Sequence, residues 1–554
     1  MADTLPPVFP PSRWDPDPVF LETPSPGAGL ASYQDMVPLQ WEPEGFYLGQ
    51  TAPEVTGYPV FDVGINDDRA VFIAAGTRGG KGVSLLVPNL IGWPGGAFCI
   101  DVKGELASFT AMRRSTRAAA EGSGTTVTRF LGQEVAVLDP MGEVQGPARV
   151  YRTGYNPLSE LNPRSPTFIS EVRTIARSII LSEDGSNAFF SDMASIILGG
   201  IIQVVVLRAQ PHQKNLVTVR NIIVEGKAMK FLAKAPDGEL VKEALGALAR
   251  VGENEGGSYH TSLVRNLAWI ADPRMKDFLK DTSGFSLMRT IQDDGTVYVS
   301  LPFADLGEQS RWLRLMLAMG LNAKLRQGVY RRGEQSTLFV VDEMPALGPL
   351  DMLEKGMGYL AGYGVKAVAV VQNIGQLRQL YAKNWQTFLG NTGAVCAFSL
   401  NDQETARYVS ERLGHYEFME ESYSRSVSHS DPKYRGKRGL FGTRKEVREY
   451  EARAGTNTSE NWSMSRKIEP IMRPEQVQQR TARRTSRMIV LPAEGRPMML
   501  ARVPYNERFS TEWYDPEKNI LRVEKALSGH SYDPEKSVRG VGNMLSKIKY
   551  LTRS

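Results

Sequence analysis

Seven short apolar runs, separated by longer segments, constrain the fold of this 554-residue chain most strongly. Each run is continuous rather than alternating and is followed by polar residues. Such runs are typical of strands buried on both faces, in a parallel sheet with helices on either side. The runs are AVFIA at 70–74, AFCID at 97–101, VAVLD at 135–139, TVYVSL at 296–301, TLFVVD at 337–342, KAVAVVQ at 366–372 and AVCAFS at 394–399. The sequence therefore predicts an α/β fold with a parallel central sheet.

The long stretch between the third and fourth runs has a different character. Segments such as ISEVRTIARSIIL and VKEALGALARV have helical periodicity and few strand signals. We therefore predict an all-α insertion at 165–290, between a first core part at 61–164 and a second at 291–510. The longest apolar run, Ile196 to Leu207, is shorter than the roughly 20 residues that cross a membrane. We interpret it as a buried helix.

Three polar regions flank or interrupt this core. Residues 1–60 are rich in Pro and Gly and predict an extended N-terminal arm over the core. Residues 420–467 predict a mobile basic loop, with nine Lys/Arg against four Asp/Glu between Tyr423 and Arg453. This loop is either a solvated connection or a contact for nucleic acid or an acidic protein. Residues 511–554 predict a basic C-terminal tail.

Composition limits the remaining classes of function. The net charge of +5 permits a nucleic-acid partner without requiring one. Cys99 and Cys396 both sit in apolar runs, which predicts two small buried hydrophobes. No Cys/His cluster has metal-ligand spacing, which argues against a zinc site. The N-terminus lacks the basic-then-apolar order of a secretory signal, so we expect a soluble chain whose membrane contacts are peripheral.

The first run leads directly into AGTRGGKG at 75–82. A phosphate-binding loop has the form GxxxxGK[ST], whose small residues let backbone amides surround the phosphates while the lysine reaches the β- and γ-phosphates. Gly80 and Lys81 match, whereas Ala75 and Gly82 replace the first glycine and the Ser/Thr. Strand, turn and apolar helix come in the required order, so we expect ATP to bind here. A simple glycine-rich turn is the alternative.

The loss of Ser/Thr at Gly82 removes the hydroxyl that usually ligates Mg²⁺. Thr77, Ser84 or a water molecule would have to replace it. The expected nucleotide-binding residues are Gly76, Thr77, Arg78, Gly79, Gly80, Lys81, Gly82 and Asp342.

Polar residues at the ends of two later runs complete the expected site. Asp342 and Glu343 follow the fifth run, and two carboxylates in that place are costly to bury without a purpose. In a RecA-like ATPase the first would hold Mg²⁺ through water and the second would act as general base. A strand-end helix cap is the alternative. Gln372 ends the sixth run and is either a γ-phosphate sensor or a structural amide. The expected catalytic residues are thus Lys81, Glu343 and Gln372.

Several motifs together resemble those of the coupling proteins of type IV secretion systems. They are GTRGGKGVSLLVPNL (76–90), IDVKGEL (100–106), LDP (138–140), YNPL (155–158), VVDEMPALG (340–348), GYGVKAVAVVQNIGQLRQLYAKNW (362–385), NTGAVCAFSLNDQETARYVSERLG (391–414) and RPEQV (473–477). The resemblance covers about residues 45–505, and a glycine after the lysine is common in that family. It implies a RecA-like P-loop NTPase core with an inserted all-α domain, a hexamer at the bacterial inner membrane, and delivery of DNA–relaxase complexes or effector proteins to a secretion channel.

The resemblance leaves some roles open. Arg78, Arg378 and Arg412 are candidates for an arginine that acts on a neighbouring subunit. Asp101, Lys103 and Glu105 follow the second run, at the edge where ligands bind, with a surface ion pair as the alternative.

Many members of the family have N-terminal transmembrane helices, which this sequence lacks. We therefore expect a cytoplasmic or peripheral protein, either a soluble form or a truncated one. An adaptor that binds ATP without hydrolysing it, and a soluble DNA-pumping ATPase, are the alternative functions.

Overall fold

The structure is a computed structural model, which describes residues 23–24, 29–52, 58–181, 188–250, 253–331, 334–349, 356, 358–430 and 455–514. The chain divides into two compact units. The core unit consists of Leu30–Val409 and Pro474–Ser554. The hairpin unit consists of Met1–Gly29 and Ser410–Arg473. Most of the predicted C-terminal tail, from residue 515 onward, lies outside the described residues.

Seven parallel strands form the centre of the core unit. They are β4 (Ala70–Ala75), β5 (Ala97–Asp101), β6 (Val135–Leu138), β7 (Thr296–Ser300), β8 (Thr337–Val341), β9 (Val365–Val371) and β10 (Thr392–Phe398). Their order across the sheet is β10-β4-β9-β8-β5-β7-β6. All their residues except Val135 are buried. The seven apolar runs thus form the seven strands, and the predicted α/β fold is confirmed.

Four antiparallel strands that were not predicted extend this sheet beyond β10. They are β13 (Arg487–Pro492), β14 (Met498–Ala501), β2 (Phe46–Thr51) and β3 (Asp62–Ile65), in that order. The predicted N-terminal arm at 1–60 is therefore wrong for residues 46–51, because the aromatic start of β2 is buried in the sheet. Asn89 fixes this strand, since its amide bonds both the N–H and the carbonyl of Tyr47 at 2.8 Å.

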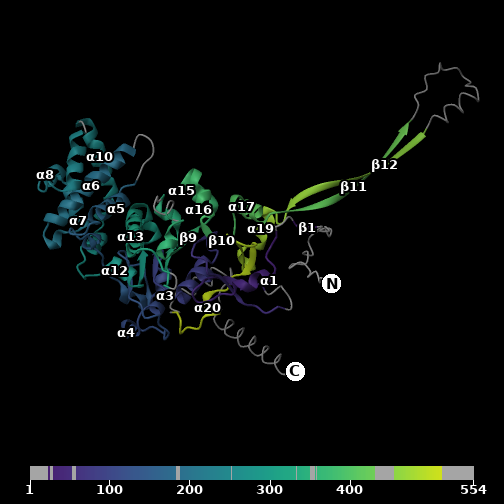
Figure 1. Ribbon diagram of the computed structural model, residues 1–554, viewed down its shortest axis with the longest axis horizontal. Helices are drawn as coiled ribbons and strands as arrows, with labels where there is room; N and C mark the ends of the chain where they lie inside the picture. The colour runs from purple at the N-terminus through teal and green to yellow at the C-terminus, as the bar shows by residue number, and fades with distance from the viewer. Residues whose placement is uncertain are drawn as a thin grey trace, which may run out of the picture. The chain divides into compact units, whose positions relative to one another are not determined.

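Helices fill the long connection between β6 and β7. The described elements there are all helices, and Figure 1 shows α5, α6, α7, α8 and α10 gathered in one group. They are α5 (Phe168–Ile179), α6 (Ala188–Arg208), α7 (Leu216–Val224), α8 (Ala228–Leu232), α9 (Glu239–Arg250), α10 (Glu253–Asn266), α11 (Pro273–Leu279) and α12 (Leu287–Gln292). The helical character predicted for 165–290 is present, although these helices belong to the same compact unit as the sheet.

The remaining helices pack on or near the sheet. They are α1 (Tyr33–Met36), α2 (Val87–Gly92), α3 (Glu105–Arg114), α4 (Arg117–Ala120), α13 (Leu306–Gln327), α15 (Ile374–Tyr381), α16 (Trp385–Gly390), α17 (Gln403–Leu413), α19 (Pro474–Arg480) and α20 (Tyr505–Arg508).

Helix α6 is the core of the helical group. Among the described residues it is the one helix whose length and composition would suit a membrane span, and 72% of its apolar window is buried inside the protein. Ile197, Ile201 and Val205 are fully buried, and the helix contacts α5, α9 and α10. The run predicted as a buried helix is confirmed as one.

Two buried cations hold segments together at the amino-terminal ends of the parallel strands. Arg114 is fully buried, and its guanidinium donates to the carbonyls of Leu90 at 2.7 Å and Trp93 at 3.1 Å, and to that of Gly95. Its Nε donates to the Thr296 hydroxyl at 2.7 Å. Arg114 therefore supplies donors to carbonyls at the end of α2 that the helix itself cannot satisfy.

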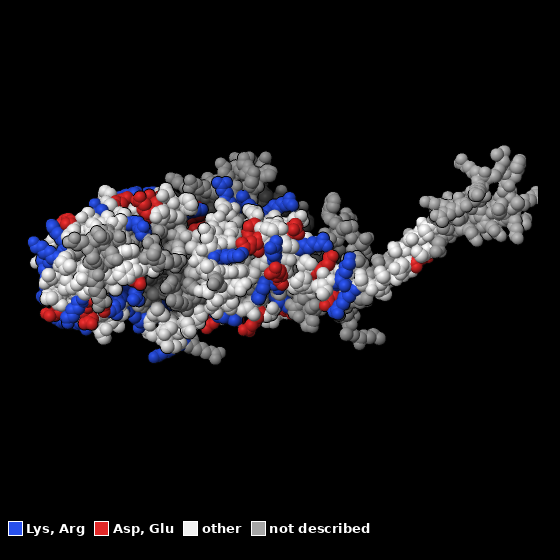
Figure 2. Space-filling view, turned by 90° about the horizontal axis from the view of Figure 1, so that it is seen from above, with Lys and Arg blue, Asp and Glu red and all other residues white. Residues whose placement is uncertain are grey.

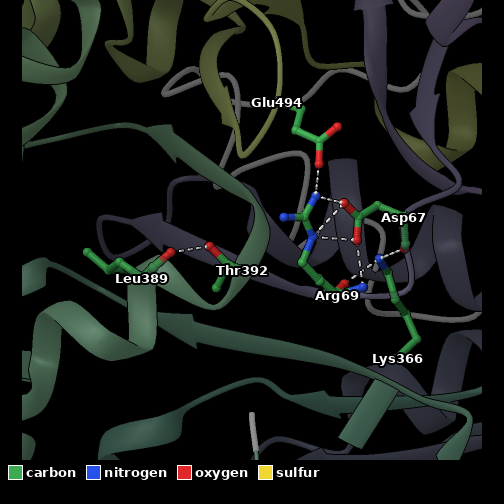
Figure 3. Close-up of polar contacts among 6 residues, drawn as sticks. All are labelled: Asp67, Arg69, Lys366, Leu389, Thr392 and Glu494. Carbon is green, nitrogen blue, oxygen red and sulfur yellow. Dashed lines mark hydrogen bonds and ion pairs between the residues drawn. The ribbon is translucent and has the colours of Figure 1, made fainter. Parts of the chain in front are cut away.

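The second buried cation, Lys366, lies at the amino-terminal edge of β4 and β9 (Figure 3). Its ammonium donates to the carbonyl of Arg69 at 2.6 Å and to that of Asp67. The side chain of Arg69 in turn pairs with Asp67 and, at 3.2 Å, with Glu494. Burial lowers the pKa of Lys366 to about 8. These contacts tie the start of β4 to β9, at the end of the strands away from the glycine-rich loop.

The hairpin unit contains a long antiparallel ribbon. Strands β11 (His415–Ser430) and β12 (Gly455–Pro470) pair along their whole length, and β1 (Thr23–Pro24) adds to the base of β11. The loop predicted at 420–467 is therefore wrong at both ends, while residues 431–454 lie outside the described residues. The polar, serine-rich sequence hides these strands, because cross-strand pairing rather than an apolar run defines them.

The register gives the ribbon two unlike faces. On one face Val427, Trp462, Met464 and Ile468 are between 49% and 68% exposed. On the other face, apart from Lys467, the exposed positions carry hydroxyl and amide side chains. These are Ser424, Ser426, Ser428, Ser459, Asn461, Ser463 and Ser465.

The distribution of charged residues and the burial of the two cysteines agree with the sequence analysis. Figure 2 shows basic and acidic residues interspersed over the described part of the face in view, in keeping with the small net charge. Cys99 and Cys396 are both free and buried, as predicted.

Candidate nucleotide site

The glycine-rich segment after β4 forms a tight loop at the carboxyl edge of the parallel strands. The Gly79 N–H donates to the Gly76 carbonyl at 2.9 Å. Arg78 and Gly80 have positive φ angles, of 57° and 89°, which only glycine adopts readily. Helical structure begins at Lys81 and runs through a π-helical turn, Gly82–Leu86, into α2. A loop that leads into a helix N-terminus presents backbone amides to an anion.

The end of β10 forms the back wall of this loop. A Cβ at Gly76 would lie 2.3 Å from the carbonyl oxygen of Ser399. A Cβ at Gly79 would lie 2.7 Å from the Gly76 carbonyl oxygen and 2.9 Å from the Ser399 Cβ. Close approach therefore requires glycine at both positions. Gly82 differs, because no atom lies within 4 Å of the place where its Cβ would be.

The ammonium of Lys81 meets the two carboxylates that follow β8. Its Nζ lies 2.7 Å from the Asp342 carbonyl oxygen, 3.3 Å from Asp342 Oδ1 and 3.5 Å from Glu343 Oε2. Burial disfavours the charged ammonium, but the carboxylates of Asp342 and Glu343 outweigh burial and raise the pKa of Lys81. The structure thus brings Lys81 together with two adjacent carboxylates that lie 261 and 262 positions later in the sequence.

Asp342 fits the expected magnesium ligand. Its Oδ1 is buried and accepts no hydrogen bond from the described residues, although the Lys81 ammonium lies 3.3 Å away. The described residues contain no group of three or more His, Cys, Asp or Glu side chains placed to hold a metal. Proteins bind Mg²⁺ through one or two carboxylates together with substrate phosphates and water, and Asp342 offers one such carboxylate.

Gln372 lies directly after β9, beside the loop. Its Oε1 accepts a hydrogen bond from the Thr77 hydroxyl at 2.9 Å. Its N–H donates to the side-chain oxygen of Gln376, in α15, at 2.8 Å. The amide is therefore in contact with the loop, and its role as a sensor stays a prediction.

The side-chain hydroxyls of Ser84 and Thr77, the two candidate ligands for Mg²⁺, differ in their exposure to solvent. Ser84 is 4% exposed, and its Oγ donates to the Gly80 carbonyl at 2.8 Å inside the helix. Thr77 is exposed at the mouth of the loop. The geometry therefore favours Thr77 or water over Ser84.

Asp101, the last residue of β5, is buried and is not part of a surface ion pair. Asp101 is fully buried, its Oδ2 accepts from the Ala107 N–H at 2.8 Å, and its Oδ1 has no hydrogen-bond partner in the part of the chain that the structure describes. Burial, reinforced by the nearby charge of Asp342, raises the pKa of Asp101 to about 7. Lys103 is exposed. The ion-pair alternative is therefore wrong for Asp101.

The arginines considered for action on a neighbouring subunit lie at the surface. Arg378 is in α15 and pairs with Glu404 at 3.0 Å. Arg412, in the last turn of α17, is exposed. Their action on another subunit stays a prediction.

Two residues that support the loop gave no signal in the sequence. Ser399 has a φ of 51°, and its N–H donates to the Thr481 carbonyl at 2.7 Å. Arg502 is 5% exposed, donates to the Gly79 carbonyl, and stacks on Phe398 with its guanidinium carbon 4.6 Å from the ring centre. Burial and the charge of a nearby arginine lower the pKa of Arg502 to about 10. A single arginine after the short apolar strand β14 carries no pattern that would identify this role.

Known proteins resemble this chain in sequence as well as in structure. A family model described as type IV secretory system conjugative DNA transfer matches residues 40–529. The chain is 26% identical to the protein VirD4 of Agrobacterium fabrum strain C58 over 370 residues, 65% of this chain and 51% of VirD4. It is 25% identical to the conjugal transfer protein TraG of Escherichia coli over 385 residues, 65% of this chain and 57% of TraG. The chain therefore spans about half the length of these curated relatives.

Solved structures of the plasmid coupling protein TrwB have the same fold. TrwB in complex with ADP and Mg²⁺ aligns with a TM-score of 0.59 at 13% identity, over 90% of this chain and 99% of TrwB. TrwB in complex with the ATP analogue ADPNP aligns with a TM-score of 0.59 at 12% identity, over 88% and 96% of the two chains. The RecA-like core predicted from the sequence is confirmed at the level of the fold.

Proposed function

Because the chain belongs to the type IV secretory system conjugative DNA transfer family, we propose that it is an ATP-driven coupling motor of a bacterial secretion system. It binds and hydrolyses ATP, and it uses the energy to deliver a DNA–relaxase complex or an effector protein to the secretion channel. The observation that carries this proposal is the convergence of Lys81 on Asp342 and Glu343 at the end of a glycine-rich loop.

Each residue of the site has a proposed task. The backbone amides of the loop and Lys81 bind the β- and γ-phosphates, and Asp342 holds Mg²⁺ through water. When bound there, Mg²⁺ would neutralise charge that develops on the phosphates. Glu343 accepts the proton of the attacking water as general base. Gln372 contacts the γ-phosphate and relays its loss to the loop through Thr77.

The structural relatives support the choice of ligands. TrwB has been solved with ADP and Mg²⁺ and with a non-hydrolysable ATP analogue. We propose that the present chain takes ATP and Mg²⁺ at the equivalent edge of its sheet. The carboxyl edge of parallel strands is the usual ligand site in such folds.

The proposal also covers the oligomeric state of the protein and its location in the cell. We propose a homo-hexamer that forms at least transiently, in the cytoplasm or at the cytoplasmic face of the inner membrane. Its partners are the cargo, DNA or protein, and components of the secretion channel. A subunit of a ring can complete its neighbour's site, and such an arginine is worth about 10³–10⁵ in rate where one is used.

The test is steady-state ATP hydrolysis by the full chain over a range of protein concentrations, with and without single-stranded DNA. Lys81→Ala and Glu343→Gln are measured beside Lys103→Ala, which removes an exposed lysine at the same edge of the sheet. We expect turnover that rises with protein concentration and DNA, little activity in the first two variants, and normal activity in the control.

Two other outcomes are informative. If ATP binds but is never hydrolysed, and Glu343→Gln changes nothing, the motor proposal is wrong and a nucleotide-gated adaptor takes its place. If ATP does not bind at all, or binds equally well to Lys81→Ala, the nucleotide site itself is wrong.

A further inference from the structure

Three arginines from distant segments lie in or beside the glycine-rich loop. Arg78 lies within the loop, Arg483 begins a 3₁₀ turn after α19 (Arg483–Thr485), and Arg502 follows β14. Arg502 donates to the Gly79 carbonyl and also to the carbonyls of Arg487 at 3.3 Å and Arg483 at 3.4 Å. The backbone of Arg483 is therefore joined to the loop through a single buried guanidinium.

Arg483 is half-buried, and two of its side-chain nitrogens are unused donors. Its Nε and Nη2 are buried and have no hydrogen-bond partner among the described residues. Burial and the positive charge of Arg78 lower the pKa of Arg483, and the charge of Arg483 contributes to the lowered pKa of Arg502. The three cations thus act on one another.

No carboxylate of the described residues forms an ion pair with any of these three arginines. Buried guanidinium donors cost free energy unless an acceptor satisfies them. Neighbouring cations add repulsion that a bound anion would relieve. An arginine fork matches phosphate oxygens in geometry as well as in charge.

We propose that Arg483 is a phosphate-binding residue of the nucleotide site, and that it contacts the phosphate chain of the nucleotide bound by its own subunit. The assignment rests on the proposed function. It favours a nucleotide over a nucleic acid because the cluster is built onto the loop itself: Arg78 is a member of that loop and Arg502 grips its Gly79 carbonyl.

The test compares Arg483→Met with Arg484→Met in the full chain. Arg484 is the next residue in the same turn and is exposed, so it is a matched control for a lost positive charge. Calorimetric titration gives the Kd for ADP with Mg²⁺ and for pyrophosphate. We expect Arg483→Met to weaken both by about 10- to 100-fold, since a hydrogen bond to a charged group is worth about 1.5–3 kcal/mol. Arg484→Met should change neither by more than about twofold.

Further variants separate a phosphate contact from a structural role. Arg483→Lys keeps the charge and should recover part of the lost affinity for pyrophosphate. Thermal melting of all variants without nucleotide should agree within a few degrees. If Arg483→Met melts much lower and Arg483→Lys restores melting without restoring affinity, the residue is structural and the inference is overturned.

The remaining outcomes keep the two proposals distinct. If the wild type binds ADP, Lys81→Ala loses it and Arg483→Met binds normally, the inference is wrong while the nucleotide site stands. If Arg483→Met instead loses only binding to single-stranded DNA, its anion is nucleic acid and the inference is again wrong. If the wild type does not bind ADP, both proposals are wrong.

Discussion

The hydroxyl of Thr77 donates a hydrogen bond to the side-chain oxygen of Gln372 at 2.9 Å. This bond joins the glycine-rich loop to the end of β9, across 295 positions of sequence. Gln372 also donates its N–H to Gln376, in the first turns of α15. Hydrogen bonds thus connect the loop, through Gln372, to the start of a helix.

This relationship predicts coupling between the two residues. Thr77→Val and Gln372→Ala should each lower kcat for ATP by about tenfold, which corresponds to about 1.4 kcal/mol. The double variant should be no slower than the slower single variant, because either change already breaks the bond. Affinity for ADP should stay within about threefold. Rate losses that simply multiply in the double variant would show that the two side chains act independently.

The glycines of the loop should differ in their tolerance of a side chain. Gly82→Ser has open space around its Cβ and restores the usual hydroxyl, so we expect a folded protein that needs less Mg²⁺ for half-maximal ADP binding. Gly79→Ala should abolish binding, because its Cβ would lie 2.7 Å from the Gly76 carbonyl oxygen. Calorimetry over a Mg²⁺ series checks both. An unchanged Mg²⁺ requirement in Gly82→Ser would place the metal away from this position.

Asp101 should make stability depend on pH. Its pKa is about 7 in the folded chain against 3.8 for the free group. Between these values the unfolded chain loses the proton while the folded chain keeps it, so stability falls as pH rises through this window. The total loss is about 4 kcal/mol at most, and it is complete above pH 7.

Asp101→Asn removes this titration and keeps an acceptor for the Ala107 N–H. We expect it to raise the melting temperature relative to the wild type at pH 8, and much less at pH 5. Asp277→Asn, at an exposed position, is the control and should show the same small difference at both pH values. A difference for Asp101→Asn that is equal at the two pH values would contradict the prediction.

Arg114 should be among the most important single side chains for stability. Arg114→Met leaves the carbonyls of Leu90, Trp93 and Gly95 without their donor. Losing a buried charged hydrogen-bonding group costs about 3 kcal/mol or more. We expect a melting temperature several degrees below that of Arg117→Met, which removes an exposed arginine nearby. Equal melting of the two variants would mean that the carbonyls find other donors.

The sequence predicted the parallel strands well because burial on both faces leaves a continuous apolar run. Strands such as β3 (DVGI) and β14 (MMLA) are four residues long, and pairing with neighbours distant in the chain decides their place and direction. The ribbon of β11 and β12 was not predicted from the sequence, for a related reason. Its serines read as a loop, and only the cross-strand register separates a polar face from an apolar one.

The residues of the candidate site also divide into those that the sequence predicted and those that only the structure revealed. Asp342 and Glu343 follow an apolar run and Lys81 ends the loop after another, where a parallel sheet brings side chains to one edge, so their meeting was predictable. Ser399, Arg483 and Arg502 act through backbone carbonyls and through space. No residue type or spacing in a single sequence predicts such contacts. The residues that form the back wall of the loop could therefore be identified only from the structure.

That back wall has a consequence for biosynthesis. The glycine-rich loop leaves the ribosome early, but the β10 strand end and the Arg502 guanidinium that shape it belong to the last third of the chain. At ordinary rates of translation they emerge on the order of tens of seconds later. A nascent chain that stalls before Arg502 would expose its lysine and glycines without the support that shapes them. If ATP binds here as proposed, part of the loop's support is therefore among the last segments of the chain to be synthesised.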